Sequence, residues 1–147
     1  MELLKIKKLT PDAVVPTRAT QGSAGYDLYA NIPSPVTIKP NEVIKIPTGI
    51  AIAIESPAYV GLVYARSGLS SKHLIAPINC VGVIDSDYRG ELMIPLINHG
   101  NSDYIFNPND RIAQLVISPV FTPQLLVVDE LDDTNRGTGG FGSTGPA

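Results

Sequence analysis

The sequence predicts an all-β domain, either a barrel or a jelly roll, followed by a glycine-rich C-terminal tail. Thirteen glycines and thirteen prolines divide the 147 residues into short runs rich in β-branched side chains, a pattern typical of sandwiches and barrels. No stretch of about ten or more residues carries the apolar stripe of an amphipathic helix,. Strands should therefore form nearly all of the regular structure.

Alternating side chains locate the strands. In the segment GIAIAIES (49–56), Ile50, Ile52 and Ile54 alternate with alanines, and this two-residue period places the isoleucines on one face of a strand. Similar runs predict four more strands, in YVGLVYAR (59–66), ELMIPLIN (91–98), RIAQLVISPV (111–120) and QLLVVDEL (124–131).

Two residues add detail to this outline. Pro95 lies inside the predicted strand 91–98, and because proline lacks an amide hydrogen it favours an edge position or a bulge there. The segment RSGLSSKHL (66–74) is the helical candidate, and we expect Ser67 to cap a short turn of helix,. Backbone amides at the start of such a helix can bind an anion.

By length the chain is one domain, with a body that we place at residues 1–133 and a tail at residues 134–147. The tail, TNRGTGGFGSTGPA, has few apolar side chains, so it should be flexible on its own. Composition alone leaves two interpretations open. The tail is either a disordered linker or a phosphate-binding lid, in which Arg136 supplies donors and Phe141 stacks on a flat ring.

Charge and composition argue against several partners. The net charge is −3 and the pI is near 5.2, which disfavours a broad grip on nucleic acid. The apolar runs are much shorter than the ~20 residues of a membrane helix, and we recognise no secretory signal. Cys80 is the single cysteine, so no internal disulfide can form. We expect a soluble protein of the cytoplasm.

Four segments of the body combine polar residues with glycine or strand patterns. Each is compatible by itself with an ordinary turn or a solvated strand face. Together they supply arginines and amide side chains of the kind that bind phosphates, and carboxylates beside them. They are SAGYDLYA (23–30) with Asp27, ARSGLSSKH (65–73) with Arg66 and Ser67, NCVGVIDSDYRGEL (79–92) with Asp85, Asp87 and Tyr88, and RIAQL (111–115) with Arg111 and Gln114.

With the tail, these segments resemble the five sequence motifs of the deoxyuridine triphosphatase (dUTPase) family, in the same order. The resemblance is carried by AGYDLYA, RSGLS, GVIDSDYRGE, RIAQL and RGTGGFGSTG, and it extends from about residue 22 to residue 145. One departure is Ala65, where the family often has proline. The resemblance implies a homotrimer of jelly-roll-like subunits, with active sites at the interfaces and the tail of one subunit closing over the site of another.

The reaction that the resemblance implies is hydrolysis of dUTP to dUMP and diphosphate, which keeps uracil out of DNA and supplies dUMP for thymidylate synthesis. Water would attack the α-phosphorus, oriented by Asp85. Because an aspartate is a weak base at neutral pH, most of its effect should be placement. Arg66, Arg136 and Mg²⁺ would balance the phosphate charge, and Asp27 would touch the metal only through water. Ser67, Gly68 and Gln114 would hold α- and β-phosphate oxygens.

The resemblance also implies how the nucleoside is selected. A hairpin from Asn79 to Asp85 would present its backbone to uracil, with Val83 and Ile84 near the base and sugar. Tyr88 would lie against the deoxyribose and exclude a 2′-hydroxyl. Met93 is either a substrate contact or a core residue. In the tail, Phe141 would stack on the uracil, while Gly142, Ser143 and Thr144 would lie at the substrate, the hydroxyls directed to its phosphates.

Two alternatives stay open from the residues alone. A dCTP deaminase shares this fold, but it needs a glutamate at the pyrimidine amine, and Glu91 lies beyond the turn. A nucleotide-binding jelly roll without catalysis would not need Asp85, Gln114 and the Arg–Gly–Phe tail at once.

Overall fold

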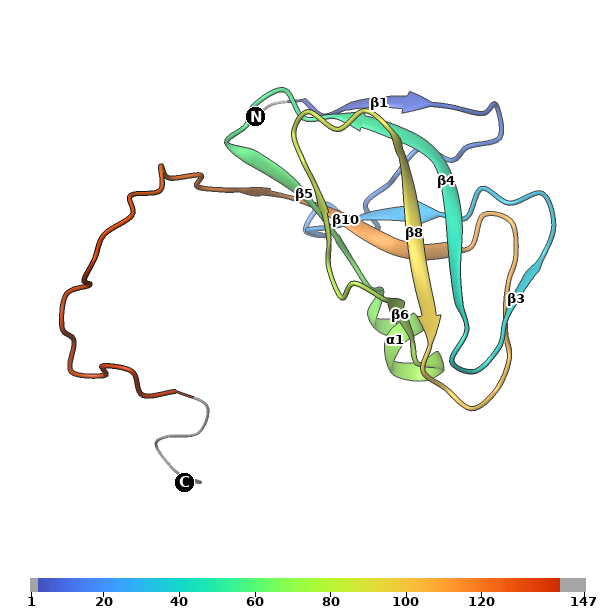
Figure 1. Ribbon diagram of the computed structural model, residues 1–147. Helices are drawn as coiled ribbons and strands as arrows, with labels where there is room; N and C mark the ends of the chain where they lie inside the picture. Colours follow the sequence, from blue (N-terminus) through green and yellow to red (C-terminus); the bar gives the residue numbers. More distant parts are fainter. Residues whose placement is uncertain (1–2, 141–147) are drawn as a thin grey trace.

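The structure, a computed structural model that describes residues 3–140, has the predicted jelly-roll-like all-β fold (Figure 1). Two antiparallel four-stranded sheets enclose the core of the described chain, with a small two-stranded sheet beside them. The strands are β1 (Lys5–Lys8), β2 (Tyr26–Tyr29), β3 (Val36–Ile38), β4 (Val43–Ala53), β5 (Tyr59–Tyr64), β6 (Ile75–Pro77), β7 (Gly82–Ile84), β8 (Glu91–Asn98), β9 (Tyr104–Phe106) and β10 (Arg111–Pro119), and helix α1 is Ser67–His73.

The order of the strands explains where the core lies. The first sheet has the order β1-β4-β8-β6, the second has the order β2-β10-β5-β7, and β3 pairs with β9. Ile50, Ile52 and Ile54 are buried as their alternation predicts, and they pack with side chains such as Leu28 and Ile94 in one cluster. The predicted strands 59–66, 91–98 and 111–120 correspond to β5, β8 and β10.

Two local predictions are wrong. Helix α1 begins at Ser67, so Arg66 occupies the cap position, and within the described chain no side-chain hydrogen bond caps this helix. Strand β8 lies between β4 and β6 and is not an edge strand, and its pairing with β4 is regular at Pro95, opposite Lys45, so Pro95 is not at a bulge either. It accommodates Pro95 because the pairing with β6 ends at Pro77 opposite Leu96, while the Pro95 carbonyl still accepts the Ile78 amide at 3.0 Å.

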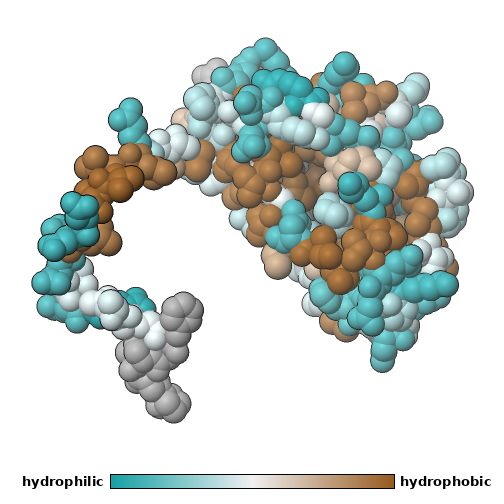
Figure 2. Space-filling view, in the orientation of Figure 1, coloured by the Kyte–Doolittle hydropathy of each residue, from teal (hydrophilic) through white to brown (hydrophobic). Residues whose placement is uncertain are grey.

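The segment after β10 does not form the strand predicted at 124–131. In the described chain, residues 120–140 form an arm without strands, and this arm leaves the barrel and curves away from it (Figure 1). Its apolar side chains are exposed, with Leu125 at 94% and Val127 at 95% of full exposure. Figure 2 shows an apolar stretch on the part of the arm nearer the barrel, and a further apolar area on the visible face of the barrel. The arm therefore carries strand-forming residues that have no partner strand within residues 3–140.

Residues 3–140 contain no helix that is both long and apolar enough to span a membrane.

Candidate active site

A buried carboxylate holds two arginines at one end of the second sheet. Asp27 on β2 is only 9% exposed. Its Oδ1 accepts a hydrogen bond from the Arg66 Nε at 2.8 Å, and its Oδ2 accepts one from the Arg111 Nη1 at 3.3 Å. The sheet brings these residues together, because β10 pairs with β2 and with β5, and Arg66 follows β5. The result is a cluster of two guanidinium groups around one carboxylate, which leaves a net positive charge for an anion.

The sequence indicates Arg111 as a polar residue of its segment but assigns it no role in the site. It lies at the start of β10 in the segment RIAQL, where a basic residue on a strand is compatible with a solvated face. Only the pairing of β10 with β2 reveals its contact with Asp27. A polar cavity of about 220 Å³ adjoins the cluster and is lined by Arg66, Leu69, His73, Tyr104, Asp110 and Arg111. Burial, and to a lesser degree the charge of Asp110, raise the pKa of Tyr104 there.

Gln114 lies beside this cluster. Its Nε2 donates to the Ala65 carbonyl at 2.9 Å, directly before Arg66. An amide nitrogen carries two hydrogens, so one donor remains for a ligand. The side chain occupies the space above Gly25, where a Cβ would lie 2.5 Å from the Gln114 Oε1. The glycine of the AGYDLYA segment therefore makes room for the Gln114 side chain.

Ser67 and Gly68 form the exposed first turn of α1. The Arg66 carbonyl accepts the amides of Leu69 and Ser70 at 3.0 Å each, which closes this turn. A Cβ on Gly68 would meet no described atom within 4 Å outside its neighbours, so packing within residues 3–140 does not require glycine there. The space above Gly68 is open to a ligand.

A second group of predicted site residues surrounds a cavity of about 230 Å³ between β7 and β8. Asn79, Val83, Ile84 and Met93 line it. The exposed fraction of Met93 is 37%, so the interpretation of this methionine as a core residue is wrong. A neighbouring cavity of about 170 Å³ shares Val83, Ile84 and Met93 with the first, and it is bounded by Asp85, Tyr88 and Glu91.

The turn between β7 and β8 holds Asp85 and Tyr88 at the surface. The Tyr88 amide donates to the Asp85 carbonyl at 3.1 Å, and the Tyr88 hydroxyl donates to the Glu91 carbonyl at 3.0 Å. The Arg89 Nη1 donates to the carbonyls of Ser86 and Tyr88 at 2.7 and 2.8 Å. Hydrogen bonds within residues 85–91 therefore stabilise the turn, and Asp85 lines the second cavity.

The cluster around Asp27 and the group of residues around the cavities at β7 and β8 lie at opposite ends of β5. Strand β7 runs antiparallel to β5 with Ile84 opposite Gly61, so Asp85 lies at the level of Val60. Arg66 is six residues further along the chain and continues β5 in an extended conformation. At about 3.3 Å per residue, the two positions are about 20 Å apart. Figure 1 shows the same relation, with β8 starting at the far end of the barrel from α1.

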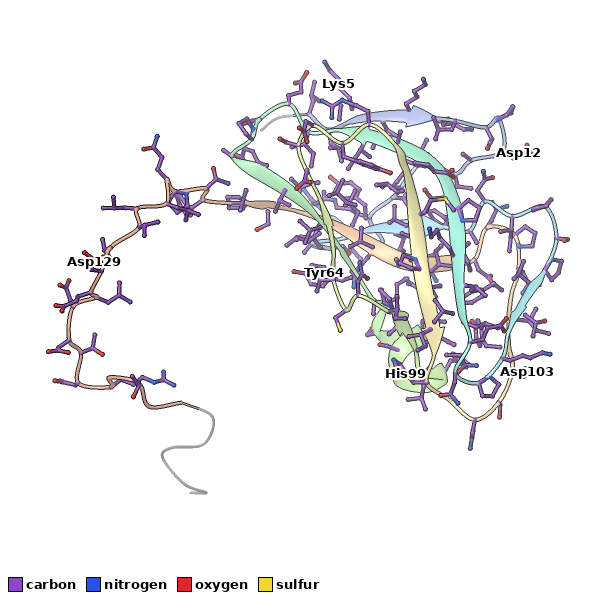
Figure 3. The ribbon with its side chains drawn as sticks, viewed as in Figure 1. Lys5, Asp12, Tyr64, His99, Asp103 and Asp129 are labelled. Carbon is purple, nitrogen blue, oxygen red and sulfur yellow. The ribbon has the colours of Figure 1, made fainter. Side chains whose placement is uncertain are left out.

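Arg136 lies on the arm, away from both groups. It is exposed, and its Nε donates to the Gly139 carbonyl at 2.9 Å in a local turn. Figure 3 shows Asp129 on the same arm, well separated from Tyr64 at the end of β5. Phe141, Gly142, Ser143 and Thr144 lie outside the described residues, so their predicted contacts stay predictions.

The described carboxylates do not form a metal cage. Among residues 3–140, no group of three or more His, Cys, Asp or Glu side chains is placed to hold a metal ion. Asp27 can still accept further hydrogen bonds, because each carboxylate has about four lone-pair positions and two are used. The predicted contact of Asp27 with a water ligand of Mg²⁺ stays a prediction.

Comparisons with known proteins found relatives in both sequence and structure. The sequence profile of the dUTPase family matches residues 12–145. The deoxyuridine 5′-triphosphate nucleotidohydrolase of Herminiimonas arsenicoxydans is 49% identical over 147 residues, which covers 99% of each chain. The dUTPase of Staphylococcus bacteriophage 80alpha with dUPNHPP superposes with a TM-score of 0.90 at 32% identity, covering 99% of this chain and 100% of the phage chain.

A mutant dUTPase from phage phi11 of S. aureus, described with a structural Mg(II) ion, is also similar. It superposes with a TM-score of 0.81 at 30% identity and covers 90% of this chain and 100% of its own.

Proposed function

The chain belongs to the dUTPase family and hydrolyses dUTP to dUMP and diphosphate, and we propose that its active site is shared between subunits of a homotrimer. The observation that carries this proposal is the separation of about 20 Å along β5 between Arg66 and Asp85,. A triphosphate whose α-phosphorus lies at Asp85 cannot also lie against Arg66 of the same chain. A complete site would form where the Arg66 end of one subunit meets the Asp85 end of another.

The exposed arm supports assembly from several copies. Its apolar residues from Phe121 to Leu131 are mostly exposed in the single chain, and such a surface is typical of an interface. A strand-forming segment without a partner within residues 3–140 can add to a sheet of another subunit. The arm then carries Arg136 and the following tail to a neighbouring active site, where Phe141 stacks on the uracil and Arg136 meets the γ-phosphate.

In the proposed reaction the Asp85 carboxylate orients a water molecule toward the α-phosphorus. The water oxygen forms the new bond to phosphorus while the bond to the departing diphosphate breaks, and the water proton passes to Asp85 and then to solvent. Arg66 and Arg136 neutralise the phosphate charge, while Ser67, Gly68 and the free Gln114 amide hydrogen hold phosphate oxygens. Mg²⁺ supplies further neutralisation of the phosphate charge when bound, with Asp27 reaching it through water.

In this proposal the base and sugar of dUTP occupy the two cavities beside β7 and β8. The backbone between Asn79 and Ile84 faces uracil, and buried backbone groups left unpaired by cytosine would cost about 1–3 kcal/mol each. Tyr88 lies against the deoxyribose and Met93 closes the side of the cavity. Because the substrate belongs to the nucleotide pool inside the cell and Cys80 is a free thiol, we place the enzyme in the cytoplasm.

A product assay tests the proposed function. Purified protein with Mg²⁺ is incubated with dUTP, dCTP, UTP or dTTP, and diphosphate and ammonia are quantified. We expect diphosphate release from dUTP at a rate at least 100-fold above the other three. Ammonia from dCTP would indicate a deaminase, and binding of dUTP without turnover would indicate a nucleotide-binding protein; either result would overturn the proposal.

A further inference from the structure

Glu91, the first residue of β8, makes a contact that the proposed reaction does not use. Its Oε1 accepts the backbone amide of Gly49 on β4 at 2.7 Å, in a partly buried position. The pairing of β4 with β8 is irregular there, since it jumps from Pro47 opposite Met93 to Ala51 opposite Glu91. Three residues of β4 therefore face a single residue of β8, and the Glu91 carboxylate accepts an amide within this bulge.

The bulge is a rigid point of attachment. Gly49 has a φ of +66°, and a Cβ there would collide with the Asn31 side chain and lie 2.7 Å from the Ala13 Cβ. The buried Thr48 hydroxyl donates to the Leu92 carbonyl at 2.7 Å, which fixes the same bulge to β8. The left-handed conformation favours glycine here, and the close side chains of Asn31 and Ala13 pack against the Gly49 backbone,.

The backbone of Glu91 holds the ring of Tyr88. The Glu91 carbonyl accepts the Tyr88 hydroxyl at 3.0 Å. The ring lies directly over Gly90, where a Cβ would be 2.5 Å from the Tyr88 Cζ. The position of the phenol ring is therefore set by the backbone of residues 90 and 91. That backbone is held in turn through the Glu91 side chain, because the carboxylate is bound to the Gly49 amide.

We propose that Glu91 is a positioning residue for the discrimination of deoxyribose from ribose. Its carboxylate anchors the start of β8 to the β4 bulge, and its carbonyl then holds Tyr88 against the sugar. This inference rests on the proposed place of Tyr88 beside the deoxyribose. Hydrogen bonds between a charged carboxylate and an amide are among the stronger ones in proteins, so loss of the carboxylate should free the ring.

The test measures kcat/KM for dUTP and for UTP in Glu91→Ala, Glu91→Gln and Glu55→Ala. Glu55→Ala is the matched control, because it removes an exposed glutamate that pairs with Lys5 near the end of β4 and outside the turn. We expect Glu91→Ala to lower the ratio of kcat/KM for dUTP to kcat/KM for UTP about tenfold. Glu91→Gln keeps an acceptor oxygen and should restore most of the ratio, and Glu55→Ala should leave it unchanged.

A double-mutant cycle separates this role from general stability. If Glu91 acts through Tyr88, then Glu91→Ala should change the ratio less than about twofold in a Tyr88→Phe background. A lower melting temperature with an unchanged ratio, or full additivity with Tyr88→Phe, would overturn the inference. If Glu91→Ala does not fold, Glu91→Asp takes its place, since it keeps the charge and withdraws the acceptor from Gly49.

Tyr88→Ala distinguishes the inference from the function on which it rests. An unchanged ratio in Tyr88→Ala would remove Tyr88 from the sugar and refute that part of the proposed function. A lowered ratio in Tyr88→Ala together with an unchanged ratio in Glu91→Ala would refute the inference alone.

Discussion

Asp27 and Arg66, which lie 39 residues apart in the sequence, meet at 2.8 Å between Oδ1 and Nε. The Asp27 side chain is largely buried, whereas about a quarter of the Arg66 side chain is exposed, 27% by area. Arg111 binds the other carboxylate oxygen. The carboxylate thus holds residues from three distant segments in one cluster, and part of each guanidinium group stays exposed.

Asp27→Asn should weaken this cluster while keeping its shape. The amide cannot compensate two guanidinium charges, so we expect kcat/KM for dUTP to fall about 10–100-fold. The unfolding free energy should fall by about 1–3 kcal/mol, less than for a fully buried pair because the arginines are partly exposed. Asp12→Asn, at an exposed acid, is the control. An unchanged kcat/KM in Asp27→Asn would show that this cluster does not contribute to substrate binding.

Gly25→Ala should displace Gln114. The added Cβ would lie 2.5 Å from the Gln114 Oε1, which is the end of a flexible side chain, so the fold should survive while the bond to the Ala65 carbonyl is lost. We expect kcat/KM to fall about tenfold. Gly22→Ala is a matched control, because its Cβ would meet no described atom within 4 Å. Equal activity of the two variants would show that Gln114 does not need this space.

Asp85→Asn should lower kcat by at least about 100-fold, with substrate binding largely kept, because it removes the oxygen that aligns water. Asp87→Asn changes an exposed aspartate two residues away in the same turn and should leave kcat nearly unchanged. Hydrolysis in ¹⁸O-labelled water should place the label in dUMP. Label in diphosphate would show attack at another phosphorus, and near-normal turnover of Asp85→Asn would exclude its role.

Deletion of residues 134–147 should abolish most activity without unfolding the body. Within residues 3–140 the last strand ends at Pro119 and residues 134–138 are exposed, so the described part of the deleted segment buries little surface. Phe141→Ala should do less, since base–aromatic stacking is worth about 1–3 kcal/mol. Trypsin should cleave at the exposed Arg136 quickly in the free protein and slowly with a non-hydrolysable dUTP analogue and Mg²⁺. Equal cleavage in both states would contradict a tail that closes over substrate.

The sequence predicts the parts of this fold that depend on local pattern. The alternation of Ile50, Ile52 and Ile54 predicts buried positions, and the run 91–98 matches β8 in full. The run 124–131 is also rich in aliphatic and β-branched residues, yet it forms no strand in the described chain, because a strand needs a neighbour that residues 3–140 do not supply. The pattern shows a preference for strand and does not show which chain provides the partner.

The site also has features that the sequence predicts and features that depend on contacts between distant residues. Resemblance to five motifs identifies the dUTPase family and its reaction, which the comparisons confirm. The sequence assigned no role to Arg111 or Glu91. The contact of Arg111 with Asp27 and that of Glu91 with Gly49 join positions 84 and 42 residues apart, which no local pattern reveals. The separation of Arg66 from Asp85 likewise follows from the register of β5 with β7, which no local pattern contains.

Complementation between two inactive variants tests the shared active site most directly. The Arg66→Gln and Asp85→Asn proteins are mixed at equal amounts, and subunit exchange is verified by native mass spectrometry. If each site takes Arg66 and Asp85 from different subunits, about a quarter of the sites in randomly mixed trimers regain both residues, and dUTP hydrolysis should recover to that extent. Verified exchange without any recovery would show that both residues act within one chain, and it would contradict the shared site.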